Sequence, residues 1–376
     1  MSKSKQSATN WTPICVWLIT IGFCLFIVLK LGDKLTPDNA GHMSVVFILS
    51  ASLFIYYISV FVQNLIMVTG HMIFGLLSGY SFGSFRIKSL LWTGENEKIK
   101  FSRKSGNRNA IAVFLLPPET KDNRHLAIPY ILGGAIANLL SAGFFLLFFL
   151  LTYNIKVMPV LMLFCTVTGL YSATVQLLPF GYEYNNFQQA YMIKKNPDAL
   201  KYYDVYMKIN KKLSEGVRLR DMPDSWFEMP EINSLSNPVL AANAVVICNR
   251  YIDNQNFSKA AEIINSILKT DNITYEYALR SLIGNKIYCD ILSGNAEEVL
   301  KYMNEEQLRF INSRSGDISF LRIKYAYTLI CENNPVKADK IKAEFEKISS
   351  KHLYPGKVQT EQELIEIADK FSFEKA

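Results

Sequence analysis

The sequence predicts an α-helical membrane protein with four transmembrane helices and a small membrane-associated β-hairpin or sheet, followed by an all-α helical-repeat cytoplasmic domain. Two observations predict this fold class. Half of the 376 residues are hydrophobic, and almost every long apolar run lies before Phe180. A helix needs about 20 apolar residues to span a bilayer, and four runs reach that length. The rest of the chain has the composition of a globular protein.

The four apolar runs cover about residues 11–31, 43–77, 126–153 and 157–178. The second run is longer than one span needs, so we expect it to tilt or to continue past the membrane surface. A cleaved signal peptide is the alternative interpretation of the first run. That run is longer than a typical signal-peptide core of about 7–15 residues and no A-x-A cleavage site follows it, which favours a membrane anchor.

Positive charges indicate the orientation of these spans. The loop between the second and third runs is rich in lysine and arginine, whereas the short loops 32–42 and 154–156 carry only Lys34 and Lys156. By the positive-inside rule, both termini and the long loop are cytoplasmic, in a multi-pass protein of the cell membrane. The formal net charge of +7 is then explained by the lipid bilayer as partner, and no nucleic-acid partner is expected.

The chain divides into four segments by composition. Residues 1–42 hold a polar tail, the first span and an outer loop, and residues 43–186 form the membrane core, with a β region at about 85–118. Alternating residues in that region predict two or three short antiparallel strands. Their exposed edge either pairs with an extended peptide or merely caps the bundle. Residues 187–230 are interpreted as a helix, interrupted at Asn196-Pro197, and an extended linker.

Residues 231–376 are predicted to form a tetratricopeptide-like helical domain. Three segments place a polar turn before a helix with an early alanine, at Ala260, Ala296 and Ala338, and the spacings of 36 and 42 residues straddle the tetratricopeptide period of about 34. Stacked helical repeats usually present a concave surface to a peptide or protein partner. The alternative is a self-contained bundle that only stabilises the membrane part.

Several classes of site lack a pattern in this sequence. The six cysteines form no C-x-x-C pair, so neither a disulfide framework nor a structural zinc site is indicated. No G-x-S-x-G nucleophile elbow occurs, and no Gly-rich phosphate loop follows a strand. Apart from Lys30 at the end of the first run, the spans hold no charged residues, so no ion path is marked, which disfavours a transporter or channel.

The second span contains the segment M-V-T-G-H at Met67–His71. In the zinc-binding motif H-E-x-x-H, two histidines one helical turn apart hold the metal, and the glutamate takes a proton from the bound water. Here Met67 stands at the first histidine and Val68 at the glutamate. His71 alone remains. A helix face with one imidazole and no carboxylate cannot perform that chemistry.

The order of elements nevertheless resembles the site-2 protease family of intramembrane zinc metalloproteases, over about Ser44–Ile193. The similarity is carried by HMIFGLLSGYSFGSFRI, LGGAIANLL and LLPFGYEYNN, which occur in the family's order, and it is greatest to members from Gram-positive bacteria with a soluble helical tail. The resemblance implies that His71 matches the second zinc histidine. It also implies that Gly133, Gly134 and Asn138 match the G-G-x-x-x-N core motif, and that Asn186 stands at the third ligand, an aspartate in the family.

The resemblance therefore implies a catalytically inactive relative, with vestigial positions Met67, Val68, His71 and Asn186. We expect no metal or other cofactor, and a binding or scaffold role in which the cytoplasmic helices engage a protein or peptide. The process that the resemblance implies is peptide maturation or export. The alternative is an active zinc metalloprotease with relocated ligands. It would use His71 and, if the alignment slips, Glu183. His125, at the cytoplasmic start of the third span, and His352, in the soluble part, are not well placed to supply a further ligand.

Overall fold

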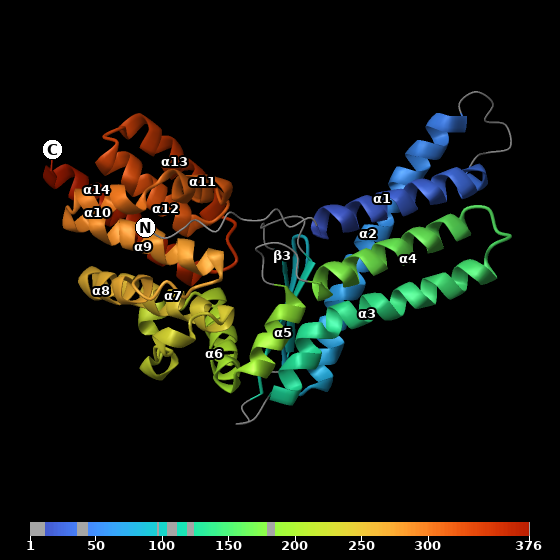
Figure 1. Ribbon diagram of the computed structural model, residues 1–376, viewed down its shortest axis with the longest axis horizontal. Helices are drawn as coiled ribbons and strands as arrows, with labels where there is room; N and C mark the ends of the chain where they lie inside the picture. The colour runs from blue at the N-terminus through green and yellow to red at the C-terminus, as the bar shows by residue number, and fades with distance from the viewer. Residues whose placement is uncertain are drawn as a thin grey trace. The chain divides into compact units, whose positions relative to one another are not determined.

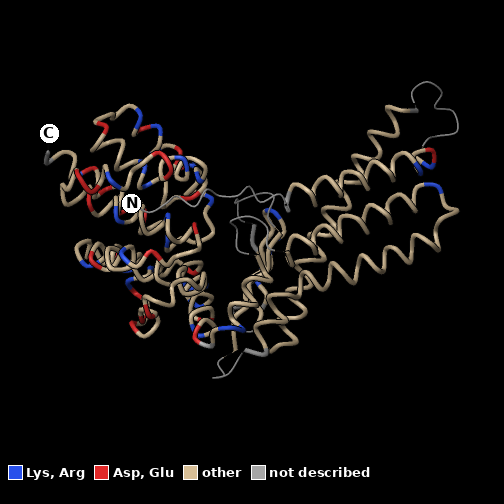
Figure 2. The backbone as a smooth tube through the Cα atoms, viewed as in Figure 1, with Lys and Arg blue, Asp and Glu red and all other residues tan. Residues whose placement is uncertain are grey.

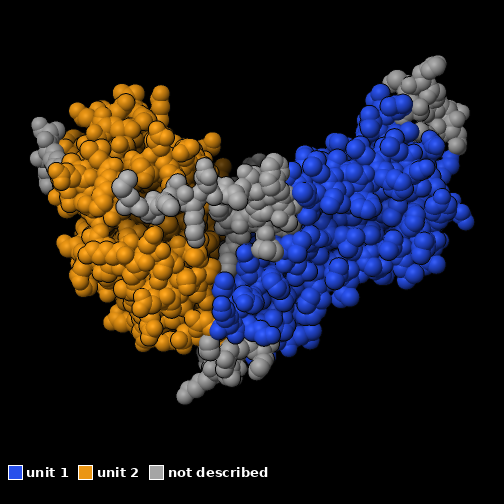
Figure 3. All heavy atoms as spheres, viewed as in Figure 1, with its two compact units in different colours: residues 1–87, 92–100, 111–195 blue, residues 88–91, 101–110, 196–376 orange. Residues whose placement is uncertain are grey.

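The structure is a computed structural model, and it describes residues 12–35, 44–95, 98–103, 111–118, 124–178 and 185–375. The chain divides into two compact units (Figure 3). Unit 1 comprises residues 1–87, 92–100 and 111–195, and unit 2 comprises residues 88–91, 101–110 and 196–376. The described part is mostly helical.

Unit 1 contains four long apolar helices: α1 (Thr12–Leu31), α2 (Ser44–Leu77), α3 (Arg124–Leu151) and α4 (Met158–Leu177) (Figure 1). All four are long and apolar enough to cross a membrane, which confirms the prediction of four such helices and is compatible with a lipid bilayer. Charged residues are nearly absent along them and gather instead on unit 2 (Figure 2). The 34 residues of α2 extend about 51 Å, well beyond the hydrocarbon thickness of about 30 Å.

The four helices pack through small and apolar side chains. Helix α3 lies against α2 and α4, and α1 lies against α4. A buried cluster that includes Ile27, Ile55 and Phe164 joins α1, α2 and α4, while the outward face keeps residues such as Leu29 exposed (83%). A 3₁₀ turn, η1 (Gly32–Leu35), follows α1. Exposed leucines all along a helix are what a lipid environment accommodates.

A four-stranded sheet follows α2. Its strands are β1 (Ser81–Ile87), β2 (Leu90–Glu95), β3 (Lys98–Arg103) and β4 (Ile111–Leu116), in the order β3-β2-β1-β4. Strands β1 and β4 pair antiparallel, with an irregularity between Phe82 and Ser84. The sequence prediction of two or three strands beginning near residue 85 was wrong in number and in its start. The irregularity at Gly83 breaks the alternation that marks a strand, so this part of β1 resembles a glycine-rich helix exit.

Helix α5 (Asn186–Lys195) ends unit 1 and α6 (Pro197–Ser214) begins unit 2. The predicted interruption at Asn196-Pro197 is confirmed. Proline takes the first position of α6, and the Asn196 side chain accepts a hydrogen bond of 3.0 Å from the Asp198 N–H, as expected of an N-cap. The boundary between the two units therefore follows Lys195. It lies nine residues beyond Asn186, the residue at which the membrane core was predicted to end.

Unit 2 continues as helices joined by short turns. They are η3 (Leu219–Asp221), η4 (Asp224–Trp226), η5 (Ile232–Ser234), α7 (Pro238–Asp253), α8 (Phe257–Leu268), α9 (Glu276–Ser293), α10 (Ala296–Tyr302), α11 (Glu305–Ser313), α12 (Ile318–Ala326), the π-helical turn η6 (Tyr327–Cys331), α13 (Pro335–Ser349) and α14 (Pro355–Lys375). Asparagine N-caps start many of them, for example Asn334, whose side chain accepts from the Lys337 N–H at 3.0 Å. The three polar turns that the sequence pattern marks contain the N-caps Asn256, Asn295 and Asn334.

Two features of unit 2 differ from the sequence predictions. The segment 218–230, interpreted as an extended linker, contains the short turns η3 and η4, and Phe227 is buried beneath the Arg250 guanidinium, 4.2 Å from the ring centroid. The alanines of the proposed repeat also differ in environment, since Ala260 and Ala338 are fully buried whereas Ala296 is exposed.

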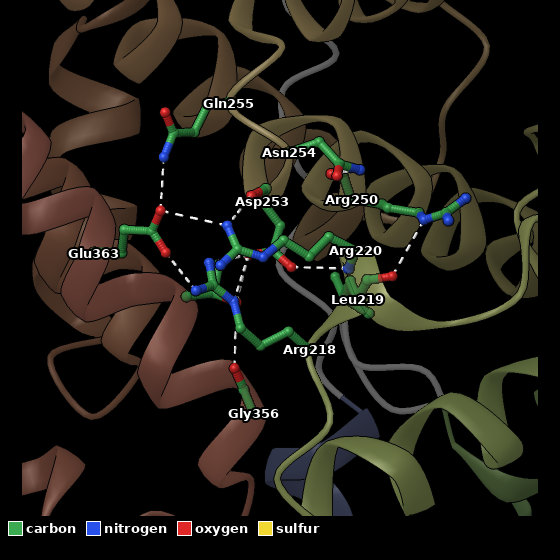
Figure 4. A network of polar contacts seen from close by, with 10 residues as sticks. Arg218, Leu219, Arg220, Arg250, Asp253, Asn254, Gln255, Gly356 and Glu363 are labelled. Carbon is green, nitrogen blue, oxygen red and sulfur yellow. Dashed lines mark hydrogen bonds and ion pairs between the residues drawn. The ribbon is translucent and has the colours of Figure 1, made fainter.

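Helix α14 joins the early and late helices of unit 2. It packs against both α6 and α12. The buried carboxylate of Asp253, on α7, binds Arg218 and accepts a hydrogen bond of 2.8 Å from the Thr360 hydroxyl of α14. Arg218 also pairs with Glu363 of α14, and Figure 4 shows these groups converging. The last helix is therefore an integral part of the core of unit 2.

Candidate functional site

The site begins at a close crossing of α2 and α3. A Cβ atom on Gly70 would lie 2.6 Å from the Gly133 carbonyl oxygen and 2.4 Å from the Ala137 Cβ. A Cβ atom on Gly133 would lie 2.8 Å from the Gly70 carbonyl oxygen. All three distances are too short for real atoms, so glycine at both positions permits backbone-to-backbone packing. Gly133, a glycine of the predicted core motif, thus packs directly against α2, the helix that carries His71.

The imidazole of His71 lies over the second glycine of this motif. A Cβ atom on Gly134 would lie 2.3 Å from His71 Nε2, so glycine there leaves the space that the ring occupies. His71 Nδ1 lies 2.9 Å from the Tyr130 carbonyl oxygen. A carbonyl only accepts, so Nδ1 carries the proton and donates it to this bond. In the neutral ring, Nε2 is then the nitrogen with the free lone pair.

The Nε2 atom of His71 faces an amide rather than a carboxylate. Asn186 Nδ2, at the start of α5, lies 3.4 Å from His71 Nε2 and 3.1 Å from Gln176 Oε1. An amide NH₂ group has two hydrogens, so Asn186 donates to both acceptors. Gln176, buried on α4, donates in turn to the Ser172 carbonyl oxygen at 3.1 Å. Residues 71 and 186, predicted from sequence as vestigial ligand positions, are thus brought together.

Asn138 joins the same network from α3. Its side chain is fully buried, and Nδ2 donates to Ser172 Oγ at 2.6 Å. Asn138 Oδ1 has no hydrogen-bond partner among the described residues. Ser172 therefore connects Asn138 with Gln176, and neutral polar groups run without a break from α3 through α4 and α5 to His71. Polar groups are expensive inside an apolar bundle, which is why they pair with one another.

A second cluster extends this polar line along α2. Gln63 is buried, its Nε2 donates to the Cys165 carbonyl oxygen at 2.8 Å, and its Oε1 accepts from Ser141 at 3.0 Å. A Cβ atom on Gly169 would lie 2.8 Å from Gln63 Nε2. The sequence analysis missed Gln63, Ser172 and Gln176 as partners in the site. The signal available for them was a glutamine inside an otherwise apolar span.

Among the described residues, the other predicted positions do not supply metal ligands next to His71. Met67 lies one turn before His71 on the same helix and is half-buried, and Val68 is buried (3% exposed). Glu183 and the side chain of His125 lie outside the described residues, and His352 belongs to unit 2. Among the described residues no group of three or more His, Cys, Asp or Glu could hold a metal ion.

Comparisons of the chain with protein-family models, with curated proteins and with solved structures give no match.

The described donor set does not fit the zinc site of an intramembrane protease. Such a site takes three protein ligands and a water that a neighbouring base deprotonates. Around His71 the near groups are the amides of Asn186 and Gln176 and the backbone of Tyr130. Amide nitrogens donate hydrogen bonds and do not bind cations. The arrangement holds one neutral imidazole in place and offers hydrogen-bonding groups within an apolar bundle.

Proposed function

We propose that this chain is a catalytically inactive, site-2-protease-like membrane protein that acts as a binding or scaffold component. In this proposal the four apolar helices cross the cell membrane, both termini are cytoplasmic, and unit 2 is a tetratricopeptide-like cytoplasmic domain that engages a protein or peptide. Peptide maturation or export is the process that the resemblance suggests.

The observation that carries the proposal is the state of the His71 ring. Its Nδ1 donates to the Tyr130 carbonyl oxygen, and the only lone pair it has left, on Nε2, faces the Asn186 amide. A zinc ligand needs that lone pair. By the resemblance, Asn186 stands at the position at which the family has an aspartate. Its amide donates a hydrogen bond to His71 Nε2, and this bond competes with a metal ion for the lone pair.

The packing around the His71 ring supports the proposal that the chain keeps the helix packing of the family and lacks its catalytic groups. Gly70, Gly133 and Gly134 each occupy positions at which a Cβ atom would collide with the neighbouring helix or with His71. Asn138 is held by Ser172. The arrangement of α2, α3 and α4 around the site is therefore compatible with the family's core. Val68, at the position of the family's glutamate, has no group that could accept a proton from a water molecule.

The binding role rests on unit 2. Its helices carry most of the charged side chains (Figure 2) and are fastened by buried ion pairs such as Arg322–Glu361, with 2.7 Å between Nε and Oε2. A rigid array of helix pairs with polar turns suits the presentation of a binding surface.

Metal content of the detergent-purified full-length chain tests the proposal. Mass spectrometry would compare the wild type with His71→Ala and, as a matched control, with His352→Ala in unit 2. We expect less than about 0.1 zinc per chain in all three, because no lone pair at His71 is free for a metal. Stoichiometric zinc that is lost with His71→Ala and kept with His352→Ala would overturn the proposal and favour the active protease.

A further inference from the structure

Unit 2 contains a cavity of about 610 Å³ between α6, α7, α9, α12 and the start of α14. This volume lies within the range of about 300–1,000 Å³ that is usual for small-ligand sites. One wall is apolar, with Ile209, Leu213 and Val245, and tyrosines such as Tyr206 and Tyr277 also line it. The cavity is formed entirely by unit 2 and shares no residue with the His71 site.

Charged side chains lie along another wall of this cavity. Arg314, Arg322 and Lys357 line it together with two carboxylates, Asp317 and Glu361. Cations thus outnumber carboxylates by one. The wall also includes the first turn of α14, where the positive end of the helix dipole adds to the positive potential.

Both carboxylates are already committed to partners within the fold. Asp317 accepts from the Ser319 N–H at 3.0 Å and from Lys357 Nζ at 3.2 Å. Glu361 accepts from the Ser319 hydroxyl at 2.6 Å and from Arg322 Nε at 2.7 Å. Ser319 therefore holds the two ion pairs side by side. Because these bonds fix α14 against α12, the charged wall exists before any ligand arrives.

The pKa shifts of Asp317 and Lys357 keep this carboxylate ionised and this ammonium group protonated near pH 7, so the excess of one positive charge in the wall remains. Burial alone raises the pKa of Asp317, but Lys357 and the hydrogen bonds from Tyr277 and Ser319 outweigh it and lower that pKa. Burial alone lowers the pKa of Lys357, but Asp317 and Glu361 raise it above its usual value. Burial and Lys357 lower the pKa of His352, so this imidazole is neutral near pH 7.

One nitrogen of the Arg322 guanidinium, which carries two N–H donors, is left without an acceptor in the described part of the chain. Its side chain is 1% exposed, its Nε bonds Glu361, and its Nη2 donates to Asn285 Oδ1 at 3.1 Å. Nη1 has no hydrogen-bond partner among the described residues. A buried guanidinium cannot lose its proton, and an unmet donor on it is costly. An acceptor oxygen supplied by a ligand in the cavity would satisfy it.

The other polar lining suits a peptide backbone. Asn210 on α6 and Asn249 on α7 both line the cavity. Asn249 Oδ1 already accepts from Asn285 Nδ2 at 2.6 Å, so Asn249 has its NH₂ group to offer a peptide carbonyl, whereas the Asn210 amide carries both a donor and an acceptor. The aromatic and aliphatic wall suits a large apolar side chain. A carboxylate, a peptide group and an apolar side chain occur together at the carboxyl-terminal end of a polypeptide.

We propose that this cavity binds the carboxyl-terminal end of a peptide, with the carboxylate directed to Arg322 and Lys357 and the last, apolar or aromatic side chain among the tyrosines. This inference deepens the proposed function by naming the chemistry of the partner. It rests on the binding role of unit 2 and is independent of the state of His71.

Binding of a defined peptide to the full-length chain in lipid nanodiscs tests the inference. The probe is acetyl-Ser-Asn-Leu-Phe with a free carboxylate, and the comparison probes are the same peptide as its amide and acetyl-phenylalanine alone. Isothermal calorimetry should give binding of the free acid, with at least about ten-fold weaker binding of the amide, because the amide loses charge-assisted hydrogen bonds. Acetyl-phenylalanine should also bind more weakly, since it has no further peptide groups for Asn210 and Asn249.

Two variants locate the binding. Ala242→Trp, on the cavity wall of α7, should abolish binding by filling the space, and Ala296→Trp, at an exposed position, is the matched control and should bind as the wild type does. Lys357→Gln should weaken the free acid about ten-fold and leave the amide unchanged. Should Ala242→Trp fail to fold by circular dichroism, Tyr206→Ala on the half-exposed rim takes its place and should weaken both peptides.

Several outcomes would overturn the inference. These are no binding of any probe to the wild type at 1 mM or below, equal binding of acid and amide, acetyl-phenylalanine binding as tightly as the tetrapeptide, or binding that Lys357→Gln and the cavity variant leave intact. Each of them leaves the metal content at His71 unaffected, so failure of the cavity assignment is distinguishable from failure of the pseudoprotease proposal.

Discussion

The buried carboxylate of Asp253 offers a quantitative test of how unit 2 is held together. Its side chain is fully buried and accepts hydrogen bonds from Arg218 Nε at 3.0 Å, the Arg220 N–H at 2.9 Å and the Thr360 hydroxyl at 2.8 Å. Asp253→Ala would remove this acceptor from the Arg220 N–H, from the Thr360 hydroxyl and from the largely buried Arg218 guanidinium, which would keep Glu363 as its remaining carboxylate partner. Removing one partner of a buried ion pair costs about 3–5 kcal/mol.

The measurement is urea-dependent pulse proteolysis of the full-length chain in detergent micelles, following the fragment that represents unit 2. With a urea dependence of about 1–3 kcal/mol per molar, the Asp253→Ala unfolding midpoint should fall by at least about 1 M. The matched control is Asp224→Ala, which removes the same side chain from an ion pair with Arg250 in which Asp224 is 96% exposed. That midpoint should not move, because an exposed pair contributes little. Equal midpoints for the two variants would refute the argument that α14 is fastened through Asp253.

Three further outcomes are expected. Because the fold lowers the pKa values of His352 and Asp317, the unfolded chain binds more protons in acid; unit 2 should lose stability as the pH falls below about 6.5 and again below about 4, and a flat urea midpoint from pH 7 to 4 would contradict this. Tyr288→Phe removes the buried hydrogen bond to the Leu364 carbonyl oxygen and should cost about 1–3 kcal/mol in the same assay, whereas an unchanged midpoint would exclude that bond as a stabilising contact. Gly70→Val should separate α2 from α3, so that a disulfide introduced across the crossing forms in the wild-type background and not in the variant; equal cross-linking would argue against the close crossing.

Local signals made the outline of this fold predictable from sequence. The ends of the second and fourth apolar runs predicted the ends of α2 and α4 to within one residue. Bilayer thickness sets the 20-residue length of α4, whereas α2 is longer than one span requires. The break at Asn196-Pro197 followed equally from the backbone chemistry of proline.

The features that sequence reasoning missed depend on which residues meet across long separations. A helix that is apolar all round gives no indication of its inward face, so the contact of Gln176 with Asn186 and the contact of Gln63 with Cys165 had no periodic signal. In unit 2, Thr360 reaches Asp253 across 107 residues of sequence, and no local pattern connects them.

The candidate site was predictable only in part. The resemblance singled out His71, Gly134, Asn138 and Asn186, and the structure places His71 next to Gly134 and Asn186. It did not indicate that the Tyr130 carbonyl oxygen would fix the proton on Nδ1. That contact depends on a backbone atom of α3, whose position no side-chain motif specifies.

Restoring the missing ligands tests whether residues 67, 71 and 186 occupy ligand positions from which the metal chemistry has been lost. We predict that the combined variant Met67→His with Asn186→Asp, purified in detergent and exposed to zinc, binds about one zinc per chain and loses it when His71→Ala is added, while the wild type binds none. A restored variant that folds and holds no zinc would contradict the placement of these residues, and stoichiometric zinc in the wild type would contradict the loss.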